Sequence, residues 1–372
     1  MVRHRKTTLS RLGVLCALAL VGILAGCAGG EDDRDVIAAA SVPKPVDDAD
    51  DVIVALDGVV HPDLVYLPPV AVDPMRFPRG RVPVSALYDR LPDLGPCDPG
   101  LLKAAERQRV LEQVNHVRAL HRLPPVRYEP ADDASTTAAA LIMAANAELT
   151  HQPTSDALCW TEAGAEGART SNLGQHSQSG GYAQHVVPSG IDLWLIDEEV
   201  AGLGHRRWLL MPALDTISYG RVIGRPPGRP DVQLFSADAI RVVGPRQDIS
   251  QLGTAVIAYP FGDYPRHLFP SDKVALSVSI LADRGPHGDN GRGVVDFDRA
   301  VIRVTGPDGR ALPVRDVRQD YEGFGLPNVL YWKLDGVQSG VQYQVEIRDI
   351  RVYGVSRVVA YPFRLIATGA PG

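Results

Sequence analysis

The sequence contains little cysteine and few aromatic residues, and it lacks the short motifs of several common enzyme classes. Only 4 of its 372 residues are cysteine, and 6% are aromatic. It has no G-x-S-x-G, H-E-x-x-H, P-loop or Rossmann glycine motif, which removes the commonest serine hydrolases, zinc peptidases and nucleotide-binding folds. No C-x-x-C pair is present to form a thiolate metal site.

The sequence also has no excess of positive charge. It carries 38 Lys and Arg against 44 Asp and Glu, a formal net charge of −6. Four basic residues and no acidic ones lie in residues 1–26, so the rest of the chain has 34 basic against 44 acidic residues, a net charge of −10. An acidic chain of this kind argues against nucleic acid as the main partner.

The N-terminus has the features of a bacterial lipoprotein signal peptide. A basic stretch precedes an apolar run over residues 12–24, which is too short to span a bilayer comfortably. The run ends in LAGC, which resembles a lipobox, in which Cys27 becomes the lipidated first residue. An ordinary signal peptide cleaved near Ala28 is the alternative. We therefore expect residues 1–26 to be removed and Cys27 to anchor the protein at the membrane of the bacterial cell envelope, outside the cytoplasm.

The remaining cysteines predict one disulfide. Once the signal segment is removed and Cys27 is lipidated, Cys97 and Cys159 remain, an even pair in an exported protein. Two free thiols or two metal ligands are the alternatives.

Composition and periodicity divide the rest of the chain into three regions and predict an α+β fold. Residues 27–95 form an acidic, Pro-rich tether, whose last part is a candidate for docking onto the folded chain. Within residues 96–245 we expect helices over 101–122 and 129–151, a loop-rich stretch over 152–189, a short helix over 190–200 and two β-like runs. Residues 250–370 contain evenly spaced, alternating apolar runs, which predict a β-sandwich like those of immunoglobulin or fibronectin domains.

Five short motifs follow one another along residues 101–240. They are VNHVRALHRLPPVRYEP, AELTHQ, SNLG, LWLID and GLGHRRWLL. Their order resembles that of the CAP superfamily, which comprises the cysteine-rich secretory, antigen 5 and pathogenesis-related-1 proteins. The resemblance implies an α-β-α sandwich with a central cleft. In that family the cleft usually holds two histidines and two acidic residues, and the two histidines can bind a divalent metal.

Transferred by motif, the resemblance predicts a cleft built around His151 and His205. Asp197, three residues after a tryptophan, matches one of the family's acidic residues. Ser171, followed by Asn172, stands where the second acidic residue is usual, which weakens any mechanism that needs two carboxylates.

Two imidazoles and a carboxylate suit Zn²⁺ or a related divalent cation, with Asp197 either a ligand or a group that orients a histidine. Arg206 lies beside His205, where it would disfavour a cation but could hold an anion or pair with Glu198. The alternative is structural, with His151 and His205 joining loops to helices by hydrogen bonds.

Two functions from different classes follow. The first is a lipid-anchored binding module for a small apolar or lipid-like ligand, a metal or an envelope protein. The second is a metal-dependent hydrolase of peptides or envelope polymers, with Asp197 as candidate base. The missing acid at Ser171 favours binding, and a purely structural role is a third possibility.

Overall fold

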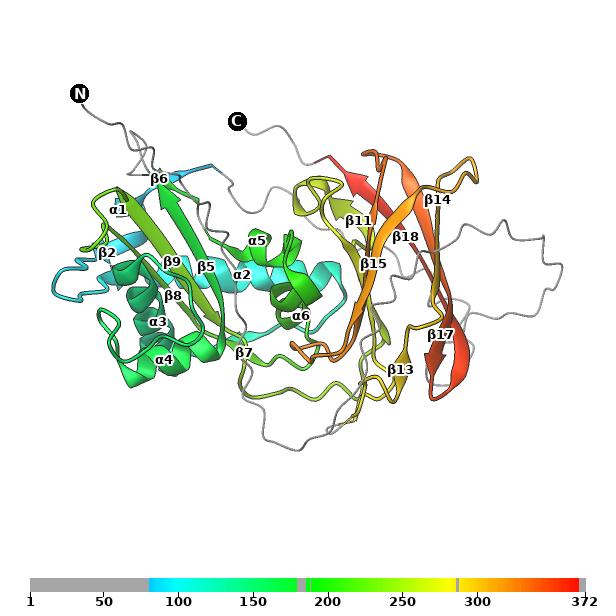
Figure 1. The fold of residues 1–372 in the computed structure, drawn as a ribbon, viewed down its shortest axis with the longest axis horizontal. Helices are drawn as coiled ribbons and strands as arrows, with labels where there is room; N and C mark the ends of the chain where they lie inside the picture. Colours follow the sequence, from blue (N-terminus) through cyan, green and yellow to red (C-terminus); the bar gives the residue numbers. More distant parts are fainter. Residues whose placement is uncertain (1–79, 179–184, 188, 286–287, 368–372) are drawn as a thin grey trace, which may run out of the picture. The chain divides into compact units, whose positions relative to one another are not determined.

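The computed structural model describes residues 80–178, 185–187, 189–285 and 288–367 (Figure 1). The predicted signal peptide, Cys27 and most of the predicted tether lie outside these residues. The fold is α+β, as predicted, with helices in the N-terminal part (residues 80–245) and several sheets. No helix among the described residues is long and apolar enough to cross a membrane.

The N-terminal part begins with short elements and two long helices. These are β1 (Val82–Pro83), α1 (Val84–Leu87), β2 (Tyr88–Arg90), β3 (Leu101–Leu102), α2 (Ala104–Leu120), β4 (Arg127–Tyr128), the 3-10 turn η2 (Pro130–Asp132) and α3 (Asp133–Asn146). Strand β2 pairs with β3, and β1 pairs with the later strand β6. The end of the predicted tether therefore lies against the folded chain.

The rest of the N-terminal part contains the strands of the main sheet. Its elements are α4 (Glu162–Arg169), β5 (Ser171–Gln178), β6 (His185–Val186), α5 (Ile191–Ile196), η3 (Ala201–Leu203), α6 (Gly204–Leu209), β7 (Thr216–Ile217), β8 (Tyr219–Gly224) and β9 (Leu234–Arg241). Strands β5, β9 and β8 form an antiparallel sheet in that order.

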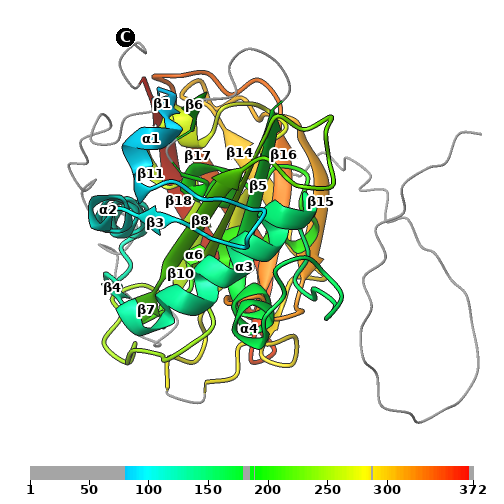
Figure 2. The same ribbon diagram turned by 90° about the vertical axis from the view of Figure 1, so that its left-hand side faces the viewer.

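The two faces of this sheet pack against different helices. Helix α3 lies across β8 and β9 with α4 beside it (Figure 2). On this face Leu173 and Ala237 pack against alanines of α3. On the other face Tyr219 and Ile240 share a core with apolar residues of α2 and α5, including Trp194. Because side chains alternate along a strand, residues two apart in β5 belong to the same face.

The prediction of a loop-rich stretch over residues 152–189 is wrong for α4 and β5. Thr161 caps α4, because its side chain accepts a hydrogen bond from the backbone N–H of Gly164 at 3.0 Å. A Cβ atom on Gly167 would lie 2.2 Å from the carbonyl oxygen of Ser135 in α3. The glycines that suggested a loop are therefore needed for close packing between α3 and α4.

The C-terminal part (residues 250–367) is built of strands. They are β10 (Val256–Tyr259), β11 (Gly262–Pro265), β12 (Leu276–Ile280), β13 (Val295–Asp296), β14 (Val301–Thr305), β15 (Val314–Asp320), β16 (Val329–Leu334), β17 (Gln342–Val352) and β18 (Val355–Ile366), with a 3-10 turn η4 (Arg266–Leu268). One sheet has the order β10-β12-β16-β15 and the other β11-β18-β17-β13, with β14 also paired to β17. Buried side chains such as Trp332 and Phe363 belong to the core of this part.

The predicted disulfide between Cys97 and Cys159 is confirmed. The two Cα atoms lie 5.4 Å apart, within the range for a disulfide. The bond joins the segment before β3 to the segment before α4. It thereby fastens the chain that leads into α2 to the chain that follows His151.

The two parts meet at the C-terminal end of α2. His121 is buried there, and its ring nitrogens bond to the carbonyl oxygen of Ala258 at 2.8 Å and the hydroxyl of Tyr264 at 3.1 Å. Burial lowers the pKa of His121 to about 3, and the charges of Arg206 and Arg118 act in the same direction. The ring is therefore neutral at physiological pH, donating to Ala258 and accepting from Tyr264.

Candidate functional site

The chain reverses direction between α5 and α6 through residues with left-handed backbone. Asp197, Glu199, Gly202 and Leu203 have φ values of 50°, 64°, 70° and 53°. Such values are uncommon for residues other than glycine and persist only where surrounding contacts impose them. These turns bring α6 back against α5 and place His205 beside Asp197.

Asp197 and His205 form the central hydrogen bond of the candidate site. His205 Nδ1 lies 2.7 Å from Asp197 Oδ1, and the side chains are 25% and 1% exposed. The other carboxylate oxygen of Asp197 accepts from the backbone N–H of Arg206 at 3.1 Å. An ionised carboxylate only accepts, so Nδ1 carries a proton, and when the ring is neutral Nε2 keeps its lone pair.

His151 presents the same ring nitrogen. It lies after α3, and its Nδ1 bonds to the carbonyl oxygen of Ala168 at 2.8 Å, which leaves Nε2 as an acceptor. Partial burial lowers the pKa of His151, and the charge of His205 lowers it further against the effect of the Ala168 hydrogen bond. We call His151, Asn172, Asp197 and His205 the histidine site.

Of the two β5 residues predicted near the cleft, Asn172 contacts the His205 segment. Its side-chain amide donates to the carbonyl oxygen of His205 at 3.0 Å. Strand alternation places Ser171 on the opposite face with Leu173, toward α3. The buried hydroxyl of Ser171 bonds to no other group in the described part of the chain.

The guanidinium of Arg206 lies in the protein interior. It donates to the carbonyl oxygens of Leu195 at 2.7 Å and Ile196 at 2.6 Å. It also donates to the carbonyl oxygen of Ala275, just before β12, at 2.9 Å and to the hydroxyl of Ser277 in β12 at 3.1 Å. Arg206 is 1% exposed, so its guanidinium is bound to these groups and not to a ligand or to Glu198, which is exposed.

Tyr259 adds a second kind of contact to Arg206. The guanidinium carbon of Arg206 lies 3.8 Å from the centre of the Tyr259 ring, a cation–π contact. Burial lowers the pKa of Arg206, and the nearby Asp197 opposes that effect.

Arg207 joins α6 to a different segment of the C-terminal part, the one that contains Asp320 and Leu326. It donates twice to the carbonyl oxygen of Leu326, at 2.9 and 2.6 Å, and once to Asp320 at 2.5 Å. It also donates to the carbonyl oxygen of Gly202 at 3.1 Å. Arg206 and Arg207 therefore tie α6, which carries His205, to two strands of the C-terminal part.

A third arginine, Arg118 in α2, holds the chain after α6. Its guanidinium donates to the carbonyl oxygens of Leu209, Met211, Pro212 and Pro124 at 3.0, 2.8, 3.2 and 2.8 Å. Burial lowers its pKa to about 9, so it remains charged at neutral pH. Its position on the helix was visible in the sequence, but its role was not, because its partners are backbone carbonyls.

The donor set of the histidine site limits how a metal could be held. The two Nε2 atoms are available, whereas both oxygens of Asp197 are already engaged. Across the described ranges, no three His, Cys, Asp or Glu side chains are placed to hold a metal ion together. The described residues would therefore offer an ion at most two imidazole ligands, and Asp197 would act only through its hydrogen bond to His205.

Comparison with known proteins does not extend this interpretation. No protein-family model matches the chain, and no curated protein matches it significantly.

Proposed function

We propose that this chain is a lipid-anchored binding protein of the bacterial cell envelope, outside the cytoplasm. In this proposal residues 96–245 form a CAP-like α-β-α domain and residues 250–370 an immunoglobulin- or fibronectin-like sandwich. The ligand is a divalent cation such as Zn²⁺, or a small apolar or envelope-derived molecule with a hydrogen-bond donor. It binds between the Nε2 atoms of His151 and His205.

The hydrogen bond between Asp197 and His205 carries this proposal. It places the proton of His205 on Nδ1, as the Ala168 carbonyl does for His151. In its neutral form each of the two imidazoles then presents a lone pair on Nε2. This arrangement suits a cation or a donor group and would be unfavourable for an anion.

The same geometry removes Asp197 as the general base of the hydrolase alternative. Hydrolysis at this site needs a general base that can receive a proton from water. Asp197 is buried, and its two oxygens accept from His205 and from the Arg206 backbone. Ser171 offers no second carboxylate. Asp197 and Ser171 therefore supply no carboxylate base at this site, and the hydrolase alternative would have to use Nε2 of His205, which Asp197 supports, as its base.

Calorimetric titration with Zn²⁺, together with elemental analysis, tests the proposal. The chain is compared with a His151→Ala/His205→Ala double variant and with His176→Ala, an exposed histidine of β5. We expect one Zn²⁺ per chain in the wild type and in His176→Ala, and loss of binding in the double variant. Zn²⁺ binding that survives in a folded double variant would place the metal elsewhere.

Detergent phase partition tests the anchor. The chain produced with its N-terminal segment should partition into the detergent phase, and Cys27→Ala should move it to the aqueous phase. Equal partition of the two proteins would argue against lipidation at Cys27.

A further inference from the structure

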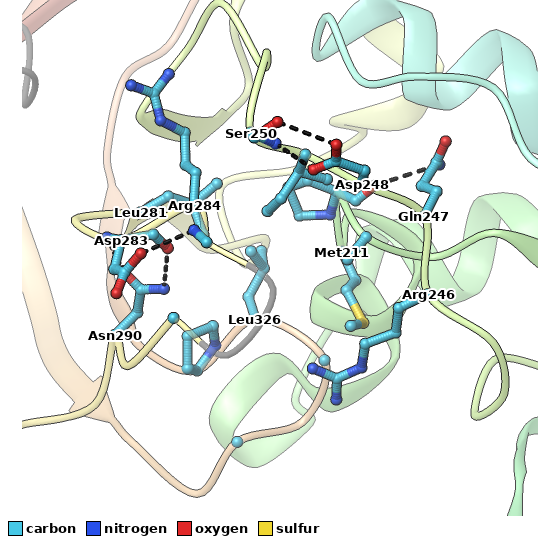
Figure 3. A pocket seen from close by; sticks show the side chains of 18 residues that line it. Met211, Arg246, Gln247, Asp248, Ser250, Leu281, Asp283, Arg284, Asn290 and Leu326 are labelled. Carbon is cyan, nitrogen blue, oxygen red and sulfur yellow. Dashed lines mark hydrogen bonds between the residues drawn. The ribbon is translucent and has the colours of Figure 1, made fainter.

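A second candidate binding site lies where four loops meet, away from the histidine site. It is a pocket of about 830 Å³, within the usual range for small-ligand sites. Its lining comes from residues 211–213 after α6, from residues 246–250, from residues 281, 283–285, 288 and 290, and from residues 323 and 325–327 (Figure 3). We call it the junction pocket. No residue of the histidine site lines it.

The junction pocket has an apolar floor. Met211, Leu281 and Leu326 line it and are 5%, 3% and 3% exposed. Figure 3 shows Met211 and Leu326 near the middle of the view, below the linker that carries Asp248 and Ser250. An apolar group bound there would be removed from water without displacing any of these side chains.

Buried hydrogen bonds hold the walls in place. Arg118 donates to the carbonyl oxygen of Met211, and Arg207 donates twice to that of Leu326. The side chain of Asn290 bonds to both the N–H and the carbonyl oxygen of Asp283, at 2.8 and 2.7 Å. The pocket is therefore formed before any ligand arrives, which lowers the entropy cost of binding.

Within the described part of the chain, the guanidinium of Arg246 and one carboxylate oxygen of Asp283 are two groups of opposite charge in the pocket that have no hydrogen-bond partner. The guanidinium of Arg246 makes no hydrogen bond or ion pair with any other described residue. One oxygen of Asp283 accepts from the N–H of Gly285 at 2.8 Å, and the other oxygen accepts from no described residue. Arg246 and Asp283 lie on opposite sides of the pocket in Figure 3.

The other two charged residues of the pocket already have partners. The oxygens of Asp248 accept from the N–H and the hydroxyl of Ser250 at 2.8 and 3.0 Å. Arg284 donates to the carbonyl oxygen of Leu252, and its guanidinium extends away from Met211 and Leu326 in Figure 3. Recognition of a charged ligand would therefore fall to Arg246 and Asp283.

We propose that the junction pocket binds a short zwitterionic peptide with apolar side chains. The C-terminal carboxylate pairs with Arg246, the N-terminal ammonium pairs with Asp283, and the side chains cover the apolar floor. A cube of 830 Å³ has an edge of about 9 Å, and three extended residues span about 10 Å, so a tripeptide matches the pocket in size. An anionic amphiphile would satisfy Arg246 but would leave the free oxygen of Asp283 beside apolar groups.

Calorimetry with trileucine on the full chain tests this proposal. Trileucine, its C-terminal amide and its N-acetyl derivative are titrated into wild type, Arg246→Ala and Asp283→Asn. The asparagine keeps an oxygen to accept from Gly285 and removes only the charge. The control is Arg225→Ala, because Arg225 is exposed and lies outside the pocket lining.

We expect trileucine to bind at one site per chain, and each terminal modification to weaken binding at least tenfold. In Arg246→Ala, trileucine and its C-terminal amide should bind with equal affinity. In Asp283→Asn, trileucine and its N-acetyl derivative should bind with equal affinity. Arg225→Ala should bind like the wild type.

Three results would overturn the proposal. One is the absence of trileucine binding at millimolar concentration. Another is equal binding of the three peptides. The third is binding of decanoate where trileucine does not bind, which would assign the pocket to an anionic amphiphile.

Discussion

The two parts of the chain differ in what they bury. Among the described residues, all buried charged side chains lie in the N-terminal part, as does the buried neutral imidazole of His121. The charged residues are Glu106, Arg118, Asp197, Arg206, Arg207, Arg221 and Asp238. The buried polar side chains of the C-terminal part are neutral: Ser277, Ser279, Asn290 and Asn328.

This difference shows that different interactions stabilise the two parts. The C-terminal strands bury apolar and aromatic side chains, so their stability comes mainly from area removed from water. The N-terminal part buries charged groups that are costly unless hydrogen-bonded. Arg206 and Arg207 find several of those bonds on C-terminal strands. The C-terminal part therefore supplies hydrogen-bond acceptors that hold buried charged side chains of the N-terminal part in place.

The largest expected effect is that of Arg206→Met. The variant leaves the carbonyl oxygens of Leu195, Ile196 and Ala275 without their donor, and leaves Asp197 buried without a neighbouring positive charge. We expect the free energy of unfolding to fall by about 4 kcal/mol, as measured by chemical denaturation.

Arg318→Met is the matched control for this variant. Arg318 lies in β15 and is exposed, so its replacement should change stability by less than about 0.5 kcal/mol. If the free energy of unfolding fell by a similar amount in both variants, the buried arginine of the N-terminal part would contribute no more to stability than the exposed arginine of the C-terminal part.

In the C-terminal part, Leu365→Ala should lower the free energy of unfolding by about 3 kcal/mol through a cavity in the core. Leu365 is fully buried in β18, whereas Val301 in β14 is 59% exposed. Val301→Ala should therefore be nearly neutral. Denaturation at pH 7.5 and pH 5 should give the same loss for Leu365→Ala, because no charge is involved. A strongly pH-dependent loss would contradict an apolar origin.

His121 should make the junction between the parts sensitive to acid. Its pKa falls from 6.5 to about 3 on folding, so between these values the unfolded chain binds a proton that the folded chain does not. Stability is therefore lost as the pH falls below 6.5, by about 1.4 kcal/mol per pH unit. From pH 7.5 to pH 5 the loss from this residue is about 2 kcal/mol.

His121→Gln tests this contribution. Glutamine can still donate to Ala258 and accept from Tyr264, but it does not titrate. The variant should lose about 2 kcal/mol less than the wild type between pH 7.5 and pH 5 in chemical denaturation. An unchanged pH dependence would show that His121 binds a proton over the same pH range in the folded and the unfolded chain.

Apart from the exposed control variants, the smallest expected effect is that of Asp197→Asn. The backbone N–H of Arg206 loses its charged acceptor, so the free energy of unfolding should fall by about 1 kcal/mol. Under the proposed function, Zn²⁺ affinity in calorimetry should fall about tenfold, because His205 loses a carboxylate partner. Unchanged affinity would show that Asp197 does not support a metal site.

Periodicity in the sequence was sufficient to predict α2, α3 and most C-terminal strands. It was not sufficient for α4, whose glycines serve packing, or for β15, whose sequence VRDVRQD has no apolar alternation because it forms an exposed edge. The neighbourhood of Asp197 and His205 was predicted from motif order. The roles of Arg206 and Arg207 were not, because several of their acceptors belong to residues 69 to 119 positions away.

The hydrogen bonds of Arg206 and Arg207 to the C-terminal part also have a consequence for how the gene can evolve. A gene shortened after the codon for residue 245 would still encode every member of the histidine site. Its product, however, would carry two neighbouring arginines deprived of Ala275, Ser277, Asp320 and Leu326 as acceptors. Only the bonds to Leu195, Ile196 and Gly202 would remain, so we expect the arginine pair and the C-terminal part to be retained or lost together. We expect descendants that have lost this part to have replaced both arginines.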